Sequence, residues 1–255
     1  MVTSNKLRGG KRRESPISAS GDGYVFEHTV QAFFILQMMM GGLAPRMDGC
    51  EITEVTLQSR KYGRNTDDCE VVFRDKNTGE NRRLLVQIKR SFNLQPSNKA
   101  FTKTIEDAWG DFTSPSFNKS CDRIVLVTGD LDTYGTGLKR MLTHIQSTYQ
   151  QAGHFWRDYT SGYTDRSTLE LQGLERLREK IKLANGGNDL SKETEFDFFR
   201  SFFIIKSDMH ESLFQDGDLN IALIHSMLAQ KRWKGDVEPW KIWELLLSFI
   251  SARNK

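Results

Sequence analysis

Near the start of the chain, apolar side chains recur at the three-to-four-residue spacing of a helix. The pattern predicts a helix over residues 23–40, which two glycines and Pro45 then end. Its apolar face comprises Phe26, Val30, Phe33, Phe34 and Met38. A continuous apolar face of this kind indicates that the helix packs against a larger core.

After this helix the pattern changes to the alternation that is typical of strands. One strand is predicted over 50–59, and two more over 69–74 and 83–89 form a hairpin around an Asn- and Gly-containing turn. The run Arg-Ile-Val-Leu-Val-Thr at 123–128 indicates a buried strand, and 195–206 predicts a short helix followed by a strand. Further helices are predicted over 101–112, 137–150, 165–184, 218–230 and 239–253.

The order is therefore one helix, three antiparallel strands, a helix, a strand and then mostly helices. This order predicts an α/β core over 21–135 and a helical C-terminal extension, 136–255, packed on that core. We expect the extension to continue into further domains of a longer protein. Residues 1–20 are rich in Lys, Arg, Ser and Gly and have no periodicity, which predicts a disordered basic tail.

Composition narrows the class of protein. With 255 residues, 38% apolar and 11% aromatic, the chain can bury a sizeable core, which excludes collagen-like and wholly disordered classes. Five basic and two acidic residues give residues 1–22 the entire net charge of +3, so nucleic-acid affinity in the rest of the chain must come from local patches. The longest apolar run, 32–40, is too short for a membrane span, and no signal peptide is evident, so we expect a cytoplasmic protein with no membrane partner.

Several familiar chemistries are excluded. Three cysteines without a CxxC pair argue against a disulfide framework and a thiolate zinc site. The five histidines show no metal-ligand spacing, and the chain contains neither a P-loop nor a GxSxG motif.

What remains is a group of polar residues on the predicted hairpin. Gln87 and Lys89 are two residues apart on one strand and therefore project from the same face, while Asp67 and Asp68 begin the strand beside it. A carboxylate, a neutral oxygen ligand and an ammonium group can together hold Mg²⁺ and a phosphate. Gln-Ile-Lys at 87–89 is the only [DEQ]xK match in the chain, although such triplets also arise by chance. The alternative interpretation is a charged sheet edge, with Lys89 preventing edge-to-edge aggregation.

Glu27 favours the first interpretation. It lies one turn into the predicted first helix among mostly apolar neighbours, and as a further metal ligand it would compensate for the uncharged Gln87. Glu51 and Glu54 on the first strand are weaker candidates for the same role.

Three motifs together, G-Y-x-F-E at 23–27, Asp-Asp at 67–68 and Q-x-K at 87–89, resemble the PD-(D/E)xK nuclease superfamily. More narrowly, they resemble the double-stranded-DNA endonuclease domain of bacterial antiphage systems, found in CBASS effectors and at the N-terminus of Avs-type NTPase proteins. Later segments, at 101–112, 123–128 and 198–208, are also similar to these domains. The resemblance implies a restriction-endonuclease-like fold, with a mixed central sheet flanked by helices.

The resemblance also implies an activity, Mg²⁺-dependent cleavage of double-stranded DNA in host defence, with Mn²⁺ able to substitute. It assigns Asp68 as the principal metal ligand, Gln87 as the second ligand and Lys89 as the catalytic lysine. Glu27 matches a glutamate that joins the site, and Asp67 is the alternative to Asp68 if the register differs by one residue. Gln87 stands where most members have an acidic ligand, which leaves open whether one or two metal ions bind.

Basic residues surround the proposed site in the sequence, and we expect them to hold DNA phosphates without reading bases. They are Arg60, Lys61, Arg64, Arg82, Arg83 and Arg90. Solvated loop charges are the alternative interpretation.

A second functional hypothesis is a catalytically silent, nuclease-like scaffold that serves as a binding or oligomerisation module. It is based on the aromatic residues of the last helices, which are Trp233, Trp240, Trp243 and Phe249. Both hypotheses are compatible with a homo-oligomer that forms on activation, and with fusion to an NTPase or sensor module.

Overall fold

The computed structural model describes residues 16–42, 49–66, 68–162, 166–207 and 238–254, together with the positions 224, 226, 228 and 229. At residues 16–22 and at Arg60 it describes the backbone alone. Within these ranges no helix is long and apolar enough to cross a membrane.

A single five-stranded sheet forms the centre of the fold, with the strands in sequence order across it. The first three strands are antiparallel to one another, whereas the last two run parallel to the third, so the sheet is mixed. The strands are β1 (Cys50–Leu57), β2 (Cys69–Asp75), β3 (Asn81–Phe92), β4 (Arg123–Leu131) and β5 (Phe202–Lys206). The predicted α/β class, the antiparallel trio and the strand at 202–206 are confirmed.

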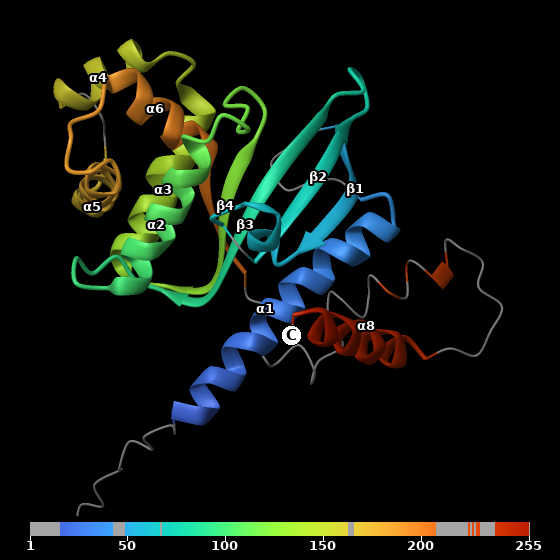
Figure 1. Ribbon diagram of the computed structural model, residues 1–255. Coiled ribbons are helices and arrows are strands. Elements are labelled where there is room, and N and C mark those ends of the chain that lie inside the picture. The colour runs from blue at the N-terminus through green and yellow to red at the C-terminus, as the bar shows by residue number, and fades with distance from the viewer. Residues whose placement is uncertain are drawn as a thin grey trace, which may run out of the picture.

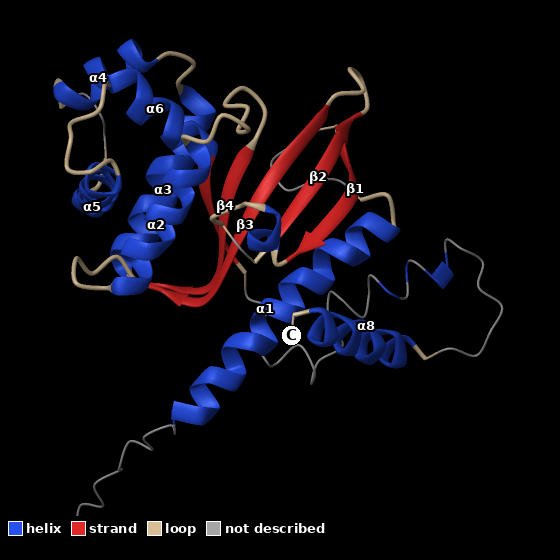
Figure 2. Ribbon diagram, viewed as in Figure 1, coloured by secondary structure: helices blue, strands red, loops and turns tan. Residues whose placement is uncertain are grey.

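Helices cover the sheet unequally (Figures 1 and 2). The first helix, α1 (Pro16–Met39), crosses one face, and the last, α8 (Pro239–Arg253), lies beside it. The others gather beyond β4, on the opposite side from α1. They are α2 (Lys99–Phe112), α3 (Thr133–Thr148), α4 (Ala152–Thr160), α5 (Thr168–Ala184) and α6 (Lys192–Ser201).

Strand β3 joins the two layers because its side chains alternate between the faces. Leu84, Val86 and Ile88 pack with Phe26 and Val30 of α1 in one core cluster. Leu85 instead joins the cluster formed by the helices of the other layer. In that second cluster β3, β4 and β5 contribute residues, but β1 and β2 contribute none. The outer half of this face is therefore available for a functional site.

The start of α1 differs from the prediction. The helix begins at Pro16, so residues 16–20 are helical rather than part of the expected tail, and residues 1–15 lie outside the described part of the chain. Proline suits the first helical position, where its missing N–H has no intrahelical partner.

Three other helices can be compared with the prediction from the sequence. The short helix α4 was not predicted, because its nine residues carry only two fully buried apolar side chains, Phe155 and Trp156. The predicted helix over 218–230 lies largely outside the described residues. Helix α8, in contrast, has the predicted bounds.

Helices α3 and α5 pack closely through a glycine on each of them. A Cβ atom at Gly137 would lie 2.5 Å from the carbonyl oxygen of Leu169, and one at Gly173 would lie 2.8 Å from that of Tyr134. These neighbours are backbone atoms, so side-chain rotation cannot make room. The two helices can approach this closely only because neither residue has a side chain.

We predict that Gly173→Ala lowers the free energy of unfolding by about 1–3 kcal/mol, because the methyl group overpacks a contact between two backbones. The control is Gly153→Ala in α4, where nothing lies within 4 Å of the new Cβ and helix propensity predicts a gain of up to about 1 kcal/mol. Urea denaturation followed by circular dichroism measures both changes. Equal stability of the two variants would contradict the packing argument.

Candidate active site

The carboxylate of Asp68 meets β3 at the point where β2 begins. One of its oxygens, Oδ2, accepts hydrogen bonds from the side-chain Nε2 of Gln87 and from the backbone N–H of Ile88, both at 2.5 Å. The ammonium group of Lys89 lies 3.9 Å from the same oxygen. The structure thus brings together the carboxylate, amide and ammonium groups that the sequence singled out.

Strand geometry explains this meeting. Cys69 pairs with Val86 across the hairpin, which places Asp68 opposite Gln87, and residues 87 and 89 share a face. That face points away from α1, because Val86 and Ile88 pack beneath the helix. Gln87 is buried, whereas the Lys89 side chain is 36% exposed and the Asp68 side chain 12%. The ion pair therefore lies at a surface that a large substrate can reach.

Glu27 reaches this region through a residue that the sequence did not single out, Gln31. The Nε2 of Gln31 donates to Glu27 Oε1 at 3.2 Å and to the backbone oxygen of Asp68 at 2.9 Å. Gln31 lies one helical turn after Glu27 and is completely buried. Its signal in the sequence was a polar residue on the face that α1 turns toward the sheet.

The C-terminal helix also contributes to the site. Asn254, which caps the end of α8, donates from Nδ2 to Gln31 Oε1 at 2.9 Å and, more weakly, to Glu27 Oε1 at 3.5 Å. In Figure 1 the end of α8, marked C, lies beside the middle of α1. No pattern in the sequence indicates a contact between residues more than 220 positions apart.

Two carboxylates, Asp68 and Glu27, are the acidic groups of this cluster. In the described ranges no three His, Cys, Asp or Glu side chains come together as a metal site. Mg²⁺, however, commonly binds proteins through one or two carboxylates and takes its other oxygen ligands from water and substrate phosphate. The donor set fits such a site, provided that the Gln87 amide turns its oxygen toward the metal.

Two titratable groups next to Asp68 and Glu27 in the chain, the Cys69 thiol and the His28 imidazole, add no charge to the site. Burial, and then the negative charges of Asp68, Glu27 and Glu70, raise the pKa of the Cys69 thiol well above its usual value, so the thiol stays protonated and unreactive. Burial lowers the pKa of His28, which follows Glu27 in the chain, so its imidazole is neutral at neutral pH.

Three other acidic candidates came from the sequence. Asp67 is outside the described residues. Glu51 lies near the start of β1, opposite Arg74, and forms an ion pair with Lys76. The candidate site is at the other end of the strand, where Leu57 pairs with Cys69. Glu54 accepts a hydrogen bond from the Thr56 hydroxyl.

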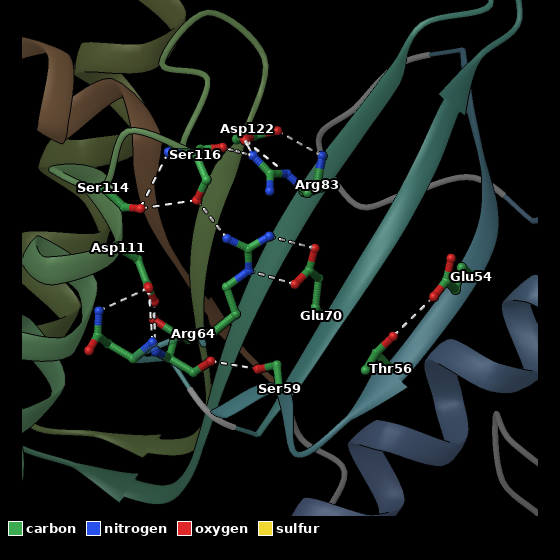
Figure 3. A network of polar contacts seen from close by, with 12 residues as sticks. Glu54, Thr56, Ser59, Arg64, Glu70, Arg83, Asp111, Ser114, Ser116 and Asp122 are labelled. Atoms are coloured by element: carbon green, nitrogen blue, oxygen red, sulfur yellow. Dashed lines mark hydrogen bonds and ion pairs between the residues drawn. The ribbon is translucent and has the colours of Figure 1, made fainter. Parts of the chain in front are cut away.

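Three of the expected DNA-binding cations form ion pairs within the protein, and those of Arg64 and Arg83 are drawn in Figure 3. Arg64 pairs with Glu70 at 2.8 Å and also donates to Ser116, and Arg83 pairs with the buried Asp122. Arg82 pairs with Asp75 at 2.6 Å, below the turn of the hairpin. Lys61 is exposed, Arg90 is partly buried, and the Arg60 side chain is outside the described part of the structure.

The segment before Asp68 is fixed by a buried carboxylate of α2, Asp111 (Figure 3). Asp111 accepts hydrogen bonds from the backbone N–H groups of Asn65 and Thr66, at 2.9 and 2.6 Å, and from the Asn65 side chain. The carbonyl of Thr66 is held in turn by the Ser59 hydroxyl at 2.7 Å. These contacts set the direction in which the chain enters β2.

No protein-family model, curated protein or solved structure matches this chain. The resemblance to nucleases therefore rests on the motifs themselves and on the geometry of the residues that carry them.

We predict that Asp111→Asn destabilises the protein by about 1–3 kcal/mol, because an amide nitrogen would face at least one of the buried N–H donors and leave it without an acceptor. Thermal unfolding measures the loss. Glu106→Gln, on the exposed side of the same helix, makes the same chemical change and should have little effect. A loss of the same size in both variants would show that Asp111 has no special role.

Proposed function

We propose that the protein is a Mg²⁺-dependent endonuclease that cleaves double-stranded DNA with little sequence specificity and acts as an effector in antiphage defence. The observation that carries the proposal is the contact of one Asp68 oxygen with Gln87 and Lys89 at the end of the hairpin. The mixed sheet flanked by helices agrees with the restriction-endonuclease-like fold that the motifs imply. Glu27, joined to Asp68 by Gln31, supplies the second carboxylate.

Each residue has a distinct role in this proposal. Asp68 and Glu27 hold Mg²⁺ through carboxylate oxygens, and Gln87 contributes its amide oxygen. The bound metal supplies Lewis-acid stabilisation of the phosphate and lowers the pKa of a coordinated water. Lys89, whose ammonium group is partly exposed, offsets the negative charge that develops on the phosphodiester during cleavage.

The experiment is cleavage of supercoiled plasmid by the wild type and by Asp68→Asn and Lys89→Met, with Mg²⁺, Mn²⁺ or EDTA. We expect metal-dependent nicking or linearisation that falls by about 10²–10³-fold in each variant, because each loses a charge needed in the transition state. Lys99→Met and Asp189→Asn change exposed residues of the same types away from the site and should cleave normally.

Cleavage by Lys89→Met at the wild-type rate would contradict the proposed catalytic lysine. A wild type that leaves plasmid intact with either metal, at both low and high protein concentration, would favour the silent scaffold. One observation favours an assembly role: helix α8 exposes Trp240, Leu245 and Phe249 at 47%, 70% and 51%. Trp243 is instead buried, and Trp233 lies outside the described residues.

We expect exposed cations to contribute to DNA affinity and cations in buried ion pairs to contribute to the stability of the protein. We predict that Lys61→Ala lowers the slope of log affinity against log salt by about 1, because one phosphate contact is lost. Arg83→Ala should instead lower the free energy of unfolding by about 1–3 kcal/mol, because it leaves the Asp122 carboxylate buried without its cation. Fluorescence anisotropy at several salt concentrations and thermal unfolding measure the two effects. The reverse pattern would mean that Arg83 is the DNA contact.

A further inference from the structure

We propose that Gln31, Gln58 and Asn254 are positioning residues through which helix α8 holds Asp68 and Glu27 in place for metal binding. This inference rests on the proposed function, because it assigns Asp68 and Glu27 to a metal site. It adds a coupling between that site and the C-terminal helix.

Gln31, Gln58 and Asn254 form a closed ring of hydrogen bonds with Asp68. The backbone oxygen of Asp68 accepts from Gln31 Nε2 at 2.9 Å and from the Gln58 N–H at 3.1 Å. The side chain of Gln58 donates to the backbone oxygen of Asn254 at 2.7 Å, and Asn254 Nδ2 donates to Gln31 Oε1 at 2.9 Å. Removing the Asn254 side chain would open the ring at Gln31, whereas the bond from Gln58 to the backbone oxygen of residue 254 would remain.

The ring also orients Glu27. Because Asn254 Nδ2 binds the oxygen of the Gln31 amide, the nitrogen of that amide must point toward Glu27 and the Asp68 carbonyl. Without Asn254 the oxygen of the Gln31 amide would lose its donor, and only the two bonds donated by Nε2 would hold the amide against Glu27 and Asp68. The Glu27 carboxylate would then be less firmly positioned.

The backbone at Gln58 indicates that this arrangement is held under strain. Gln58 has a φ of +51° and is the one non-glycine residue with a positive φ in the described ranges. Such a conformation persists only where surrounding contacts fix it. Here both the N–H and the side chain of Gln58 are bound, to Asp68 and to Asn254.

Helix α8 packs on the described part of the protein through an apolar cluster that it shares with α1. Its buried residues Trp243 and Ile250 pack against Ala32 and Leu36 of α1. At its end, Asn254 Oδ1 is buried and has no hydrogen-bond partner among the described atoms, which weakens the docked state. Undocking of α8 would release Gln31 and Gln58 together.

The test measures Mn²⁺ affinity by isothermal titration calorimetry, and plasmid cleavage against Mn²⁺ concentration, for the 255-residue chain. We expect Asn254→Ala to weaken Mn²⁺ binding by about 10-fold or more, as is typical when the partner of a metal ligand is removed. The maximal cleavage rate at saturating Mn²⁺ should change less. Ser248→Ala, on the exposed side of α8, is the matched control and should bind as the wild type does.

A double-mutant cycle tests whether Asn254 acts on the metal site through Gln31. If Asn254 acts through Gln31, adding Asn254→Ala to Gln31→Ala should cause no further loss of Mn²⁺ affinity. Losses that multiply in the double variant would overturn that route.

Gln58→Gly separates positioning from stability. Glycine accepts the positive φ without strain, so the variant should be as stable as the wild type or more so, yet lose Mn²⁺ affinity because the bond to Asn254 is gone. Wild-type affinity in both Gln58→Gly and Asn254→Ala would overturn the coupling. A wild type that neither binds Mn²⁺ nor cleaves DNA would instead overturn the proposed function on which it rests.

Discussion

The central strand β3 is the constraint on which the rest of the structure depends. It is hydrogen-bonded to β2 on one edge and β4 on the other, and its side chains are buried alternately on both faces. A shift of one residue in its register would exchange the two faces and place Gln87 and Lys89 beneath α1. The apolar residues that pack against the two helical layers therefore fix where the polar residues point.

The candidate site lies where this packing ends. Asp68 enters β2 along a path set by Asp111 of α2, and its carboxylate meets the backbone and side chains of β3. On this face β1 and β2 add no residues to the core of the helical layer, and polar side chains that pair with one another occupy the space instead. Arg64 and Arg83 form ion pairs there, which gives them a structural role whatever they contribute to DNA binding.

Helix α1 links the core, the site and the C-terminal helix. Phe26 and Val30 bury its apolar face on the sheet, Glu27 and Gln31 turn toward Asp68, and Ala32 and Leu36 receive α8. One helix thus contacts both the candidate site and α8. On the coupling that we propose, a change at Asn254 alters Gln31 and, through it, Asp68.

The sequence by itself determined the elements and the main polar residues. Alternation placed Gln87 and Lys89 on one face, hairpin pairing brought Asp68 to them, and helical periodicity predicted α1 and α8. These properties depend on neighbours within a few residues or on a single turn. The tertiary structure alone decided the rest: the ion pairs of Arg64 and Arg83, and the contacts of Gln31 with Asp68 and Asn254. Those contacts join segments up to 223 positions apart, and the order of residues along the chain carries no local signal for such a distance.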